Sequence, residues 1–232
     1  MSPLLHPPGL GRGGTLGAGA TPAGEMQLRW PGLDPLDPTL DVLVFDDSGS
    51  LTGAAGNDPV GNRYAEARRA VELLSQWTMT SRQKLAVLHF DYPHVDSDGP
   101  HRLDQAKSRN QALRALAVPS GVYGSSALAP AMMAANRIAR DHGEITRCTI
   151  FSDFELADPN PAQPYDEIAA FPGLVHAIVL NADPPTALTA VPNVTVTRLA
   201  SDSPPGLAAA ALMQSLATGR RGARRPALRI RR

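Results

Sequence analysis

The apolar run at residues 42–45 constrains the fold most, because it leads without a spacer into a cluster of acids and hydroxyls. A short run of β-branched, aliphatic and aromatic residues is typical of a strand buried on both faces of a parallel sheet. Ligands of open α/β sheets bind just beyond the carboxyl ends of such strands. The polar residues that follow are therefore candidate binding residues, although an ordinary strand-to-helix turn also prefers Asp, Ser and Gly. They are Asp46, Asp47, Ser48, Gly49 and Ser50.

Strand-like and helix-like segments alternate along the rest of the chain. Further buried strands are predicted at residues 85–90, 148–151 and 174–180, and an edge strand at 194–199. Helices are predicted at residues 63–79, 104–116, 128–140, 165–170, 184–191 and 207–216. Asp104 is expected to cap the second of these helices. The alternation predicts an α/β fold, with a doubly wound, mostly parallel sheet and helices on both faces.

The two ends of the chain differ in composition from its body. Residues 1–38 hold eight Gly and seven Pro, which predicts a mostly irregular or flexible N-terminal segment. Residues 220–232 hold seven of the 22 basic residues and no acid, which leaves 15 basic against 22 acidic residues elsewhere. We therefore expect one domain at residues 39–218 and an Arg-rich tail at residues 219–232. A basic tail of this kind could bind nucleic acid, and no other part of the chain is considered for it. We expect instead a solvated, disordered tail, because no aromatic residues are interleaved to stack on bases.

Cysteine usage and hydrophobic run lengths limit the class of protein. Cys148 is the single cysteine, which excludes an internal disulfide framework and a multi-cysteine zinc site. No apolar run follows a basic start, and none approaches the length of a membrane span. We expect a cytoplasmic protein that does not associate with membranes.

Hydroxyls and carboxylates recur at the ends of the predicted strands and in the loops that lead into helices. Strands that share one edge of the sheet would bring these side chains together. Oxygen ligands without a soft ligand predict a site for Mg²⁺, and Mn²⁺ or Ca²⁺ also suits them. Exchange of one ion-bound water for a carboxylate of another molecule would make such a site a binding point for an acidic partner. The candidate ligands are Asp46, Ser48, Ser50, Ser126 and Asp153.

The spacing of Asp46, Ser48 and Ser50 resembles the DxSxS motif of von Willebrand factor A (vWA) domains. The segments LDVLVFDDSGS, NRYAEARRAVELL, KLAVLHFD, GSSAL and TIFSD are similar to successive vWA elements, over roughly residues 40–218. The resemblance implies a six-stranded, Rossmann-like sheet with one antiparallel edge strand. It also implies a metal-ion-dependent adhesion site (MIDAS), at which the ion mediates protein binding and no reaction is catalysed.

Two of the matched positions depart from the usual vWA pattern. Ser126 stands where the family usually has Thr, and it keeps the hydroxyl oxygen. Phe154 stands where the family usually has Gly, so its side chain is expected to reshape or partly cover the rim of the site. Intracellular bacterial members often serve as adaptors for MoxR-type AAA+ ATPases or as parts of multi-protein stress and defence systems, and these partners are implied by analogy alone.

Two other functions stay open. A vWA-like scaffold without metal dependence would bind through other surfaces, and Phe154 favours it. The segment FDDSGSLT also resembles the nucleophile block of GDSL-type serine hydrolases, with Ser48 as the nucleophile. The expected DxxH is absent, since Gly173 stands three residues before His176. Asp47, at the variable position of the motif, and His89, within an apolar strand, are predicted to have structural roles.

Overall fold

Strand β3 (Thr39–Phe45) lies inside a six-stranded sheet, and all of its residues are buried. The sheet has the order β5-β4-β3-β6-β7-β8. The computed structural model describes residues 24–52, 58, 63–90, 97–118, 126–142, 145–200 and 202–230, with the backbone alone at Gly24, Thr52, Asp98, Arg229 and Ile230. Most of the Gly-rich loop at 51–62 therefore lies outside the described residues.

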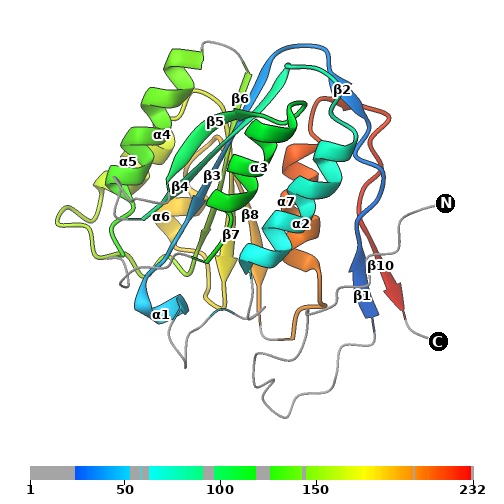
Figure 1. Cartoon of the computed structure of the whole chain (residues 1–232). Helices are drawn as coiled ribbons and strands as arrows, with labels where there is room; N and C mark the ends of the chain where they lie inside the picture. The colour runs from blue at the N-terminus through cyan, green and yellow to red at the C-terminus, as the bar shows by residue number, and fades with distance from the viewer. Residues whose placement is uncertain are drawn as a thin grey trace.

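The register of the sheet brings the carboxyl ends of the central strands together. β3 pairs in parallel with β4 (Gln83–His89) and β6 (Ile145–Ser152), so that Phe45 lies beside His89 and Phe151. The remaining strands are β5 (Asp98–Arg102), antiparallel to β4, and β7 (Leu174–Leu180) and β8 (Val194–Leu199), which extend the parallel part beyond β6. The chain runs outward from β3 to β5 and then returns to β6 on the other side (Figure 1). Ligands of open α/β sheets bind where the strand order reverses, which here is between β3 and β6.

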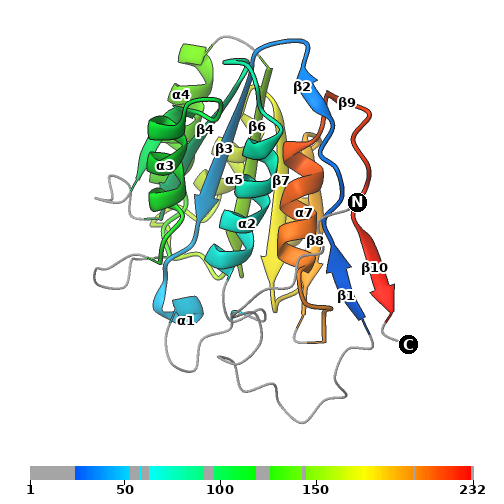
Figure 2. The same cartoon turned by 45° about the vertical axis from the view of Figure 1, so that its right-hand side comes forward.

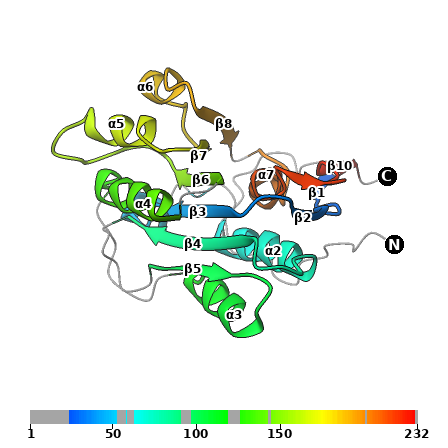
Figure 3. The ribbon, with the colours of Figure 1, turned by 90° about the horizontal axis from the view of Figure 1, so that it is seen from above.

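Alternate residues of β3 face two separate helix layers, as the period of a strand requires. Leu43 and Phe45 belong to one hydrophobic cluster, and Leu40, Val42 and Val44 belong to the other. The first layer consists of α2 (Arg63–Gln76), α3 (Ala106–Ala115) and α7 (Leu207–Leu216), and the second of α4 (Ala129–His142), α5 (Gln163–Ala169) and α6 (Thr186–Thr189) (Figure 3). The predicted doubly wound α/β fold with one antiparallel edge strand is confirmed.

Residues 24–38 and 219–230 include paired strands, which corrects, over these residues, the predictions of a flexible N-terminal segment at 1–38 and a disordered tail at 219–232. Strand β1 (Gly24–Gln27) pairs antiparallel with β10 (Ala227–Ile230), and β2 (Leu33–Pro35) pairs antiparallel with β9 (Arg220–Arg221). The paired segments run beside α7 (Figure 2). Residues 1–23 lie outside the described residues, and the domain boundaries near 38 and 218 remain predictions.

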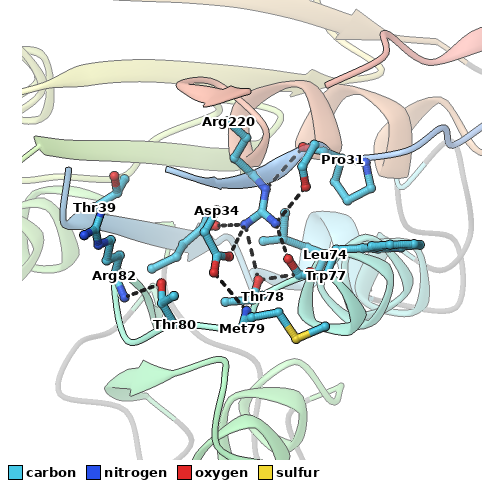
Figure 4. Close-up of polar contacts among 12 residues, drawn as sticks. Pro31, Asp34, Thr39, Leu74, Trp77, Thr78, Met79, Thr80, Arg82 and Arg220 are labelled. Atoms are coloured by element: carbon cyan, nitrogen blue, oxygen red, sulfur yellow. Dashed lines mark hydrogen bonds and ion pairs between the residues drawn. The ribbon is translucent and has the colours of Figure 1, made fainter. Parts of the chain in front are cut away.

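Arg220 shows why the end of the chain folds back. Its side chain is fully buried, and it donates from Nη2 to the Trp77 carbonyl at 2.6 Å and from Nε to the Pro31 carbonyl at 3.2 Å (Figure 4). Nη1 donates to Gln83 Oε1 at 2.6 Å and lies 3.5 Å from the Asp34 carboxylate. A buried guanidinium is stable when its N–H groups meet acceptors, and these acceptors come from segments distant in sequence.

Two smaller expectations have different outcomes. Asp104 does not cap α3, whose N-cap is Gln105, because the Asp104 carboxylate instead accepts hydrogen bonds from Arg102 at 3.1 and 2.7 Å. Cys148 is buried in β6, as predicted. In the part of the chain that the structure describes, no helix is long and apolar enough to cross a membrane.

Candidate functional site

Asp46 is the first residue after β3 and is completely buried. Its backbone N–H continues the pairing with β6 by donating to the Phe151 carbonyl at 2.9 Å. Its carboxylate accepts the backbone N–H of Ser48 at 2.9 Å and the hydroxyl of Ser152 at 2.6 Å. The bond to the N–H two residues on is the Asx turn that Asp favours, and it directs the chain into the short helix α1 (Gly49–Thr52).

Two serines connect this turn to the loop after β6. The Oγ atoms of Ser48 and Ser50 lie 2.9 Å apart, and the Ser50 hydroxyl donates to Asp153 Oδ2 at 3.1 Å. The other carboxylate oxygen of Asp153 accepts the backbone N–H of Glu155 at 3.0 Å. The structure therefore brings together Asp46, Ser48, Ser50 and Asp153, from the ends of β3 and β6.

Ser126 is connected through its backbone to the loop after β6. Its carbonyl accepts the N–H of Ala157 at 3.0 Å, which ties the segment before α4 to the loop after β6. The Asp158 carboxylate strengthens this connection, because it accepts the N–H groups of Leu128 and Ala129 at 3.0 and 2.9 Å. The side chain of Ser126 is half-buried. Ser125, its neighbour in the same loop, lies outside the described residues.

The two carboxylates have hydroxyl and amide partners. Burial raises the pKa of Asp46, hydrogen bonds from Ser152 and Ser48 oppose this shift, and the charge of Asp153 adds to it. A cation between the two carboxylates would offset both the burial and the like-charge repulsion. The described ranges contain no group of three or more His, Cys, Asp or Glu side chains placed to hold a metal, so a cation here needs the serine hydroxyls as well.

Ser152 is a site residue that sequence reasoning missed. It is completely buried, donates to Asp46, and accepts the backbone N–H of Phe154 at 2.8 Å. The signal lies in the register: Phe45 pairs with Phe151, so the residues that follow them face each other. That pairing is known only once β3 and β6 are known to be neighbours.

Phe154 does not cover the rim of the site, which corrects the expectation. Its φ is 60°, in the left-handed region that favours glycine. The residue is 5% exposed and belongs to the hydrophobic cluster between the sheet and α4. The unusual backbone thus turns the ring into the core, and the support that Phe154 gave to a scaffold without metal dependence falls away.

The serine-hydrolase alternative would need a histidine base at the Ser48 hydroxyl. Its hydroxyl pairs with that of Ser50. His89 contacts Asp47 at 2.6 Å, and His176 contacts Thr197 at 2.9 Å. His89 and His176 thus each have a polar partner other than Ser48.

Comparisons of the sequence and of the structure give different results. No protein-family model and no curated protein matches the sequence. Among solved structures, the pilus adhesin SpaC from Lactobacillus rhamnosus GG is similar with a TM-score of 0.61 and 11% identity, over 81% of this chain and 31% of that chain.

Two further solved structures extend the likeness. A von Willebrand factor type A protein from Catenulispora acidiphila has a TM-score of 0.58 and 15% identity, over 86% of this chain and 50% of that one. The conserved hypothetical protein BatB from Bacteroides thetaiotaomicron has a TM-score of 0.53 and 12% identity, over 78% of this chain and 98% of that one. This chain thus spans about a third of SpaC and half of the Catenulispora protein. The predicted fold is confirmed: the chain has the fold of a von Willebrand factor A domain.

Proposed function

We propose that the chain is a non-catalytic protein-interaction module that holds Mg²⁺ in a MIDAS and binds an acidic partner through the ion. The observation that carries the proposal is the continuous set of contacts from Asp46 through Ser48 and Ser50 to Asp153, which joins two loops at the reversal of strand order. These four residues, with Ser126 from the loop before α4, are the proposed ligands.

The chemistry of these side chains suits a hard divalent cation. They offer carboxylate and hydroxyl oxygens, and Mg²⁺ prefers a few such ligands together with retained water. Mn²⁺ and Ca²⁺ accept the same ligand class. A bound ion supplies a positive centre at which a partner's carboxylate replaces a water molecule. In this structure the serine hydroxyls form hydrogen bonds to one another and to the carboxylates. An entering cation would replace these hydrogen bonds with contacts between the ion and the same oxygen atoms.

The description of one structural neighbour as an adhesin supports an interaction role. SpaC is described as a pilus adhesin, and the Catenulispora protein as a von Willebrand factor type A protein. The identities are low, so the likeness concerns the fold, and the partner stays part of the proposal. A MoxR-type AAA+ ATPase in the cytoplasm, or a multi-protein stress or defence system, is the partner class that the family analogy favours.

Metal binding is tested by calorimetric titration of the full chain with MgCl₂ and MnCl₂. We expect saturable binding to the wild type and its loss in Asp46→Ala. Asp37→Ala is the matched control, because Asp37 is exposed and precedes the same strand. At a metal concentration 100 times Kd, binding should raise the free energy of unfolding by about 2.7 kcal/mol. Absence of binding heat in the wild type would refute the metal site.

The role of the ion in partner binding is tested separately. The chain is mixed with a purified MoxR-type ATPase and passed over a gel-filtration column. We expect a complex with Mg²⁺ that dissociates with EDTA and does not form with Asp46→Ala. A complex that survives both treatments would support the scaffold without metal dependence. Ester hydrolysis lost on Ser48→Ala would support the serine hydrolase instead.

A further inference from the structure

Asp47 lies between two proposed ligands, and its carboxylate faces away from them. We propose that Asp47 is a positioning residue, which Tyr64 and His89 hold so that Asp46 and Ser48 are kept in place for the ion. This inference rests on the proposed metal site and assigns the support of that site to three residues outside its ligand set.

The direction of the Asp47 side chain follows from its place after β3. Residues two apart in an extended chain point to the same face of a sheet, so Asp47 shares the α2 face with Phe45. Asp47 is 4% exposed, its Oδ1 accepts the hydroxyl of Tyr64, and its Oδ2 lies 2.6 Å from Nδ1 of His89. Both carboxylate oxygens thus have partners in the protein, so Asp47 is not expected to serve as a metal ligand.

His89 fixes this contact from the neighbouring strand. It is the last residue of β4 and is completely buried. Its Nε2 lies 3.1 Å from the carbonyl oxygen of Ala115, which can only accept a hydrogen bond. Nε2 therefore donates to this carbonyl, and Nδ1 at the other side of the ring faces Oδ2 of Asp47. The imidazole is held at both ends and has one orientation.

Aromatic packing holds the two partners of Asp47 in place. The ring of Phe45 stacks on Tyr64 with centroids 4.9 Å apart, and on His89 with centroids 6.0 Å apart. Tyr64 is buried near the start of α2, so its hydroxyl has little freedom to follow a displaced carboxylate. The packed rings of Phe45, His89 and Tyr64, from β3, β4 and α2, therefore support the loop at 46–48 on the side of α2.

Arg63 extends this support to Asp46. Its guanidinium is buried, donates from Nη2 to the backbone carbonyl of Asp46, and pairs through Nη1 with Asp58 at 3.1 Å. The guanidinium also lies over the Tyr64 ring, 4.8 Å from its centroid. Two adjacent residues of α2 thus hold two adjacent residues of the loop, one through a backbone oxygen and one through a side chain.

Groups that orient metal ligands control affinity without touching the ion, and their loss typically weakens binding by about 10-fold to 100-fold. Loss of the Asp47 contacts should therefore let the loop at 46–48 adopt conformations in which the Asp46 and Ser48 oxygens no longer converge. This effect differs from general destabilisation, because it acts on metal affinity even when the protein stays folded.

The test compares two buried aspartates, Asp47 just after β3 and Asp41 within it. Asp47→Ala removes the acceptor of Tyr64 and His89, and Tyr64→Phe removes a single hydroxyl. Asp41→Ala is the matched control: Asp41 is equally buried, and its carboxylate pairs with Arg147 at 2.7 Å near the opposite end of β3. Each full-length variant is titrated with MnCl₂ by calorimetry, and its folded fraction at the temperature of the titration is measured by circular dichroism.

We expect Asp47→Ala and Tyr64→Phe to raise the Kd for Mn²⁺ by about 10-fold to 100-fold. Asp41→Ala should lower the melting temperature and leave that Kd within about twofold. Asp47→Asn, which keeps one carbonyl oxygen, should lose less affinity than Asp47→Ala. Wild-type affinity in folded Tyr64→Phe and Asp47→Ala, or an equal loss in Asp41→Ala, would overturn the positioning role alone. No Mn²⁺ binding by the wild type would overturn the metal site itself, and the positioning role with it.

Discussion

The Ser152 hydroxyl donates a hydrogen bond of 2.6 Å to the Asp46 carboxylate, and both residues are completely buried. Asp46 follows Phe45 and Ser152 follows Phe151, and these two phenylalanines pair on neighbouring parallel strands. The first residue of the proposed metal site is thus fixed by strand pairing at the point where the strand order reverses. The register of β3 and β6 therefore also sets the distance between Asp46 and Ser152.

Removing the Ser152 hydroxyl should destabilise the protein. Ser152→Ala leaves the buried Asp46 carboxylate short of one donor, so the free energy of unfolding should fall by about 1–3 kcal/mol. Urea unfolding in EDTA measures this change without a contribution from bound metal. Ser81→Ala, at an exposed position, should change the free energy by less than about 0.5 kcal/mol. Equal midpoints for Ser152→Ala and wild type would contradict the role assigned to the hydroxyl.

At Phe154, glycine should be a less destabilising substitution than alanine, which is the reverse of the usual order. Phe154→Ala loses the buried ring at a cost of about 3–5 kcal/mol and keeps a side chain in the left-handed conformation. Phe154→Gly loses the same ring and relieves a backbone cost of about 1–2 kcal/mol. The glycine variant should therefore have the higher free energy of unfolding of the two, as measured by denaturant titration. A more stable alanine variant would show that the backbone at this position changes when the ring is removed.

Arg220 and Arg221 are adjacent arginines with opposite environments. Arg220→Ala leaves the Trp77 and Pro31 carbonyls without their donor and should lower the free energy of unfolding by about 3–5 kcal/mol. Arg221 is exposed, so Arg221→Ala should change it by less than about 0.5 kcal/mol. Thermal unfolding of the two variants distinguishes a structural segment from a solvated tail. If both variants changed the free energy of unfolding by similarly small amounts, Arg220 would belong to a solvated tail, as the sequence predicts.

His176 should make stability depend on pH below neutrality. Burial lowers its pKa from 6.5 to about 4, so the folded protein binds a proton less readily than the unfolded chain. The stability present above pH 6.5 is therefore lost as the pH falls toward 4, by up to about 3 kcal/mol. His176→Gln, which cannot titrate, should lose less stability than wild type between pH 7 and pH 4.5 in urea titrations. Identical pH profiles would assign the acid sensitivity to other groups.

Sequence periodicity predicts most of the architecture. The buried run at 42–45, the amphipathic pattern at 63–79 and the apolar run at 174–180 correspond to β3, α2 and β7. The same reasoning places Asp46 and Asp153 at the ends of two strands, where the structure brings them into one group. Such predictions succeed because burial on one or both faces leaves a local pattern that needs no knowledge of the partner segment.

The capping of α3 shows where local reasoning fails. Asp104 has the residue type and position of a helix cap, yet its carboxylate bonds to Arg102. Phe154 likewise departs from the usual glycine without blocking the site, because a positive φ directs its ring into the core. In both cases the local choice depends on groups that a linear pattern does not place.

The sequence by itself determined the order of the parallel strands and the longer helices, and the polar residues that end the central strands, because these features depend on residues close together in the chain. Only the tertiary structure decided which polar groups meet. It buried Arg220 among carbonyls from the N-terminal segment and α2, placed Ser152 on Asp46, and joined Asp47 to Tyr64 and His89. The physical reason is that a buried polar group must find its partner within hydrogen-bond distance, and strand register and helix packing set that distance between segments far apart in sequence.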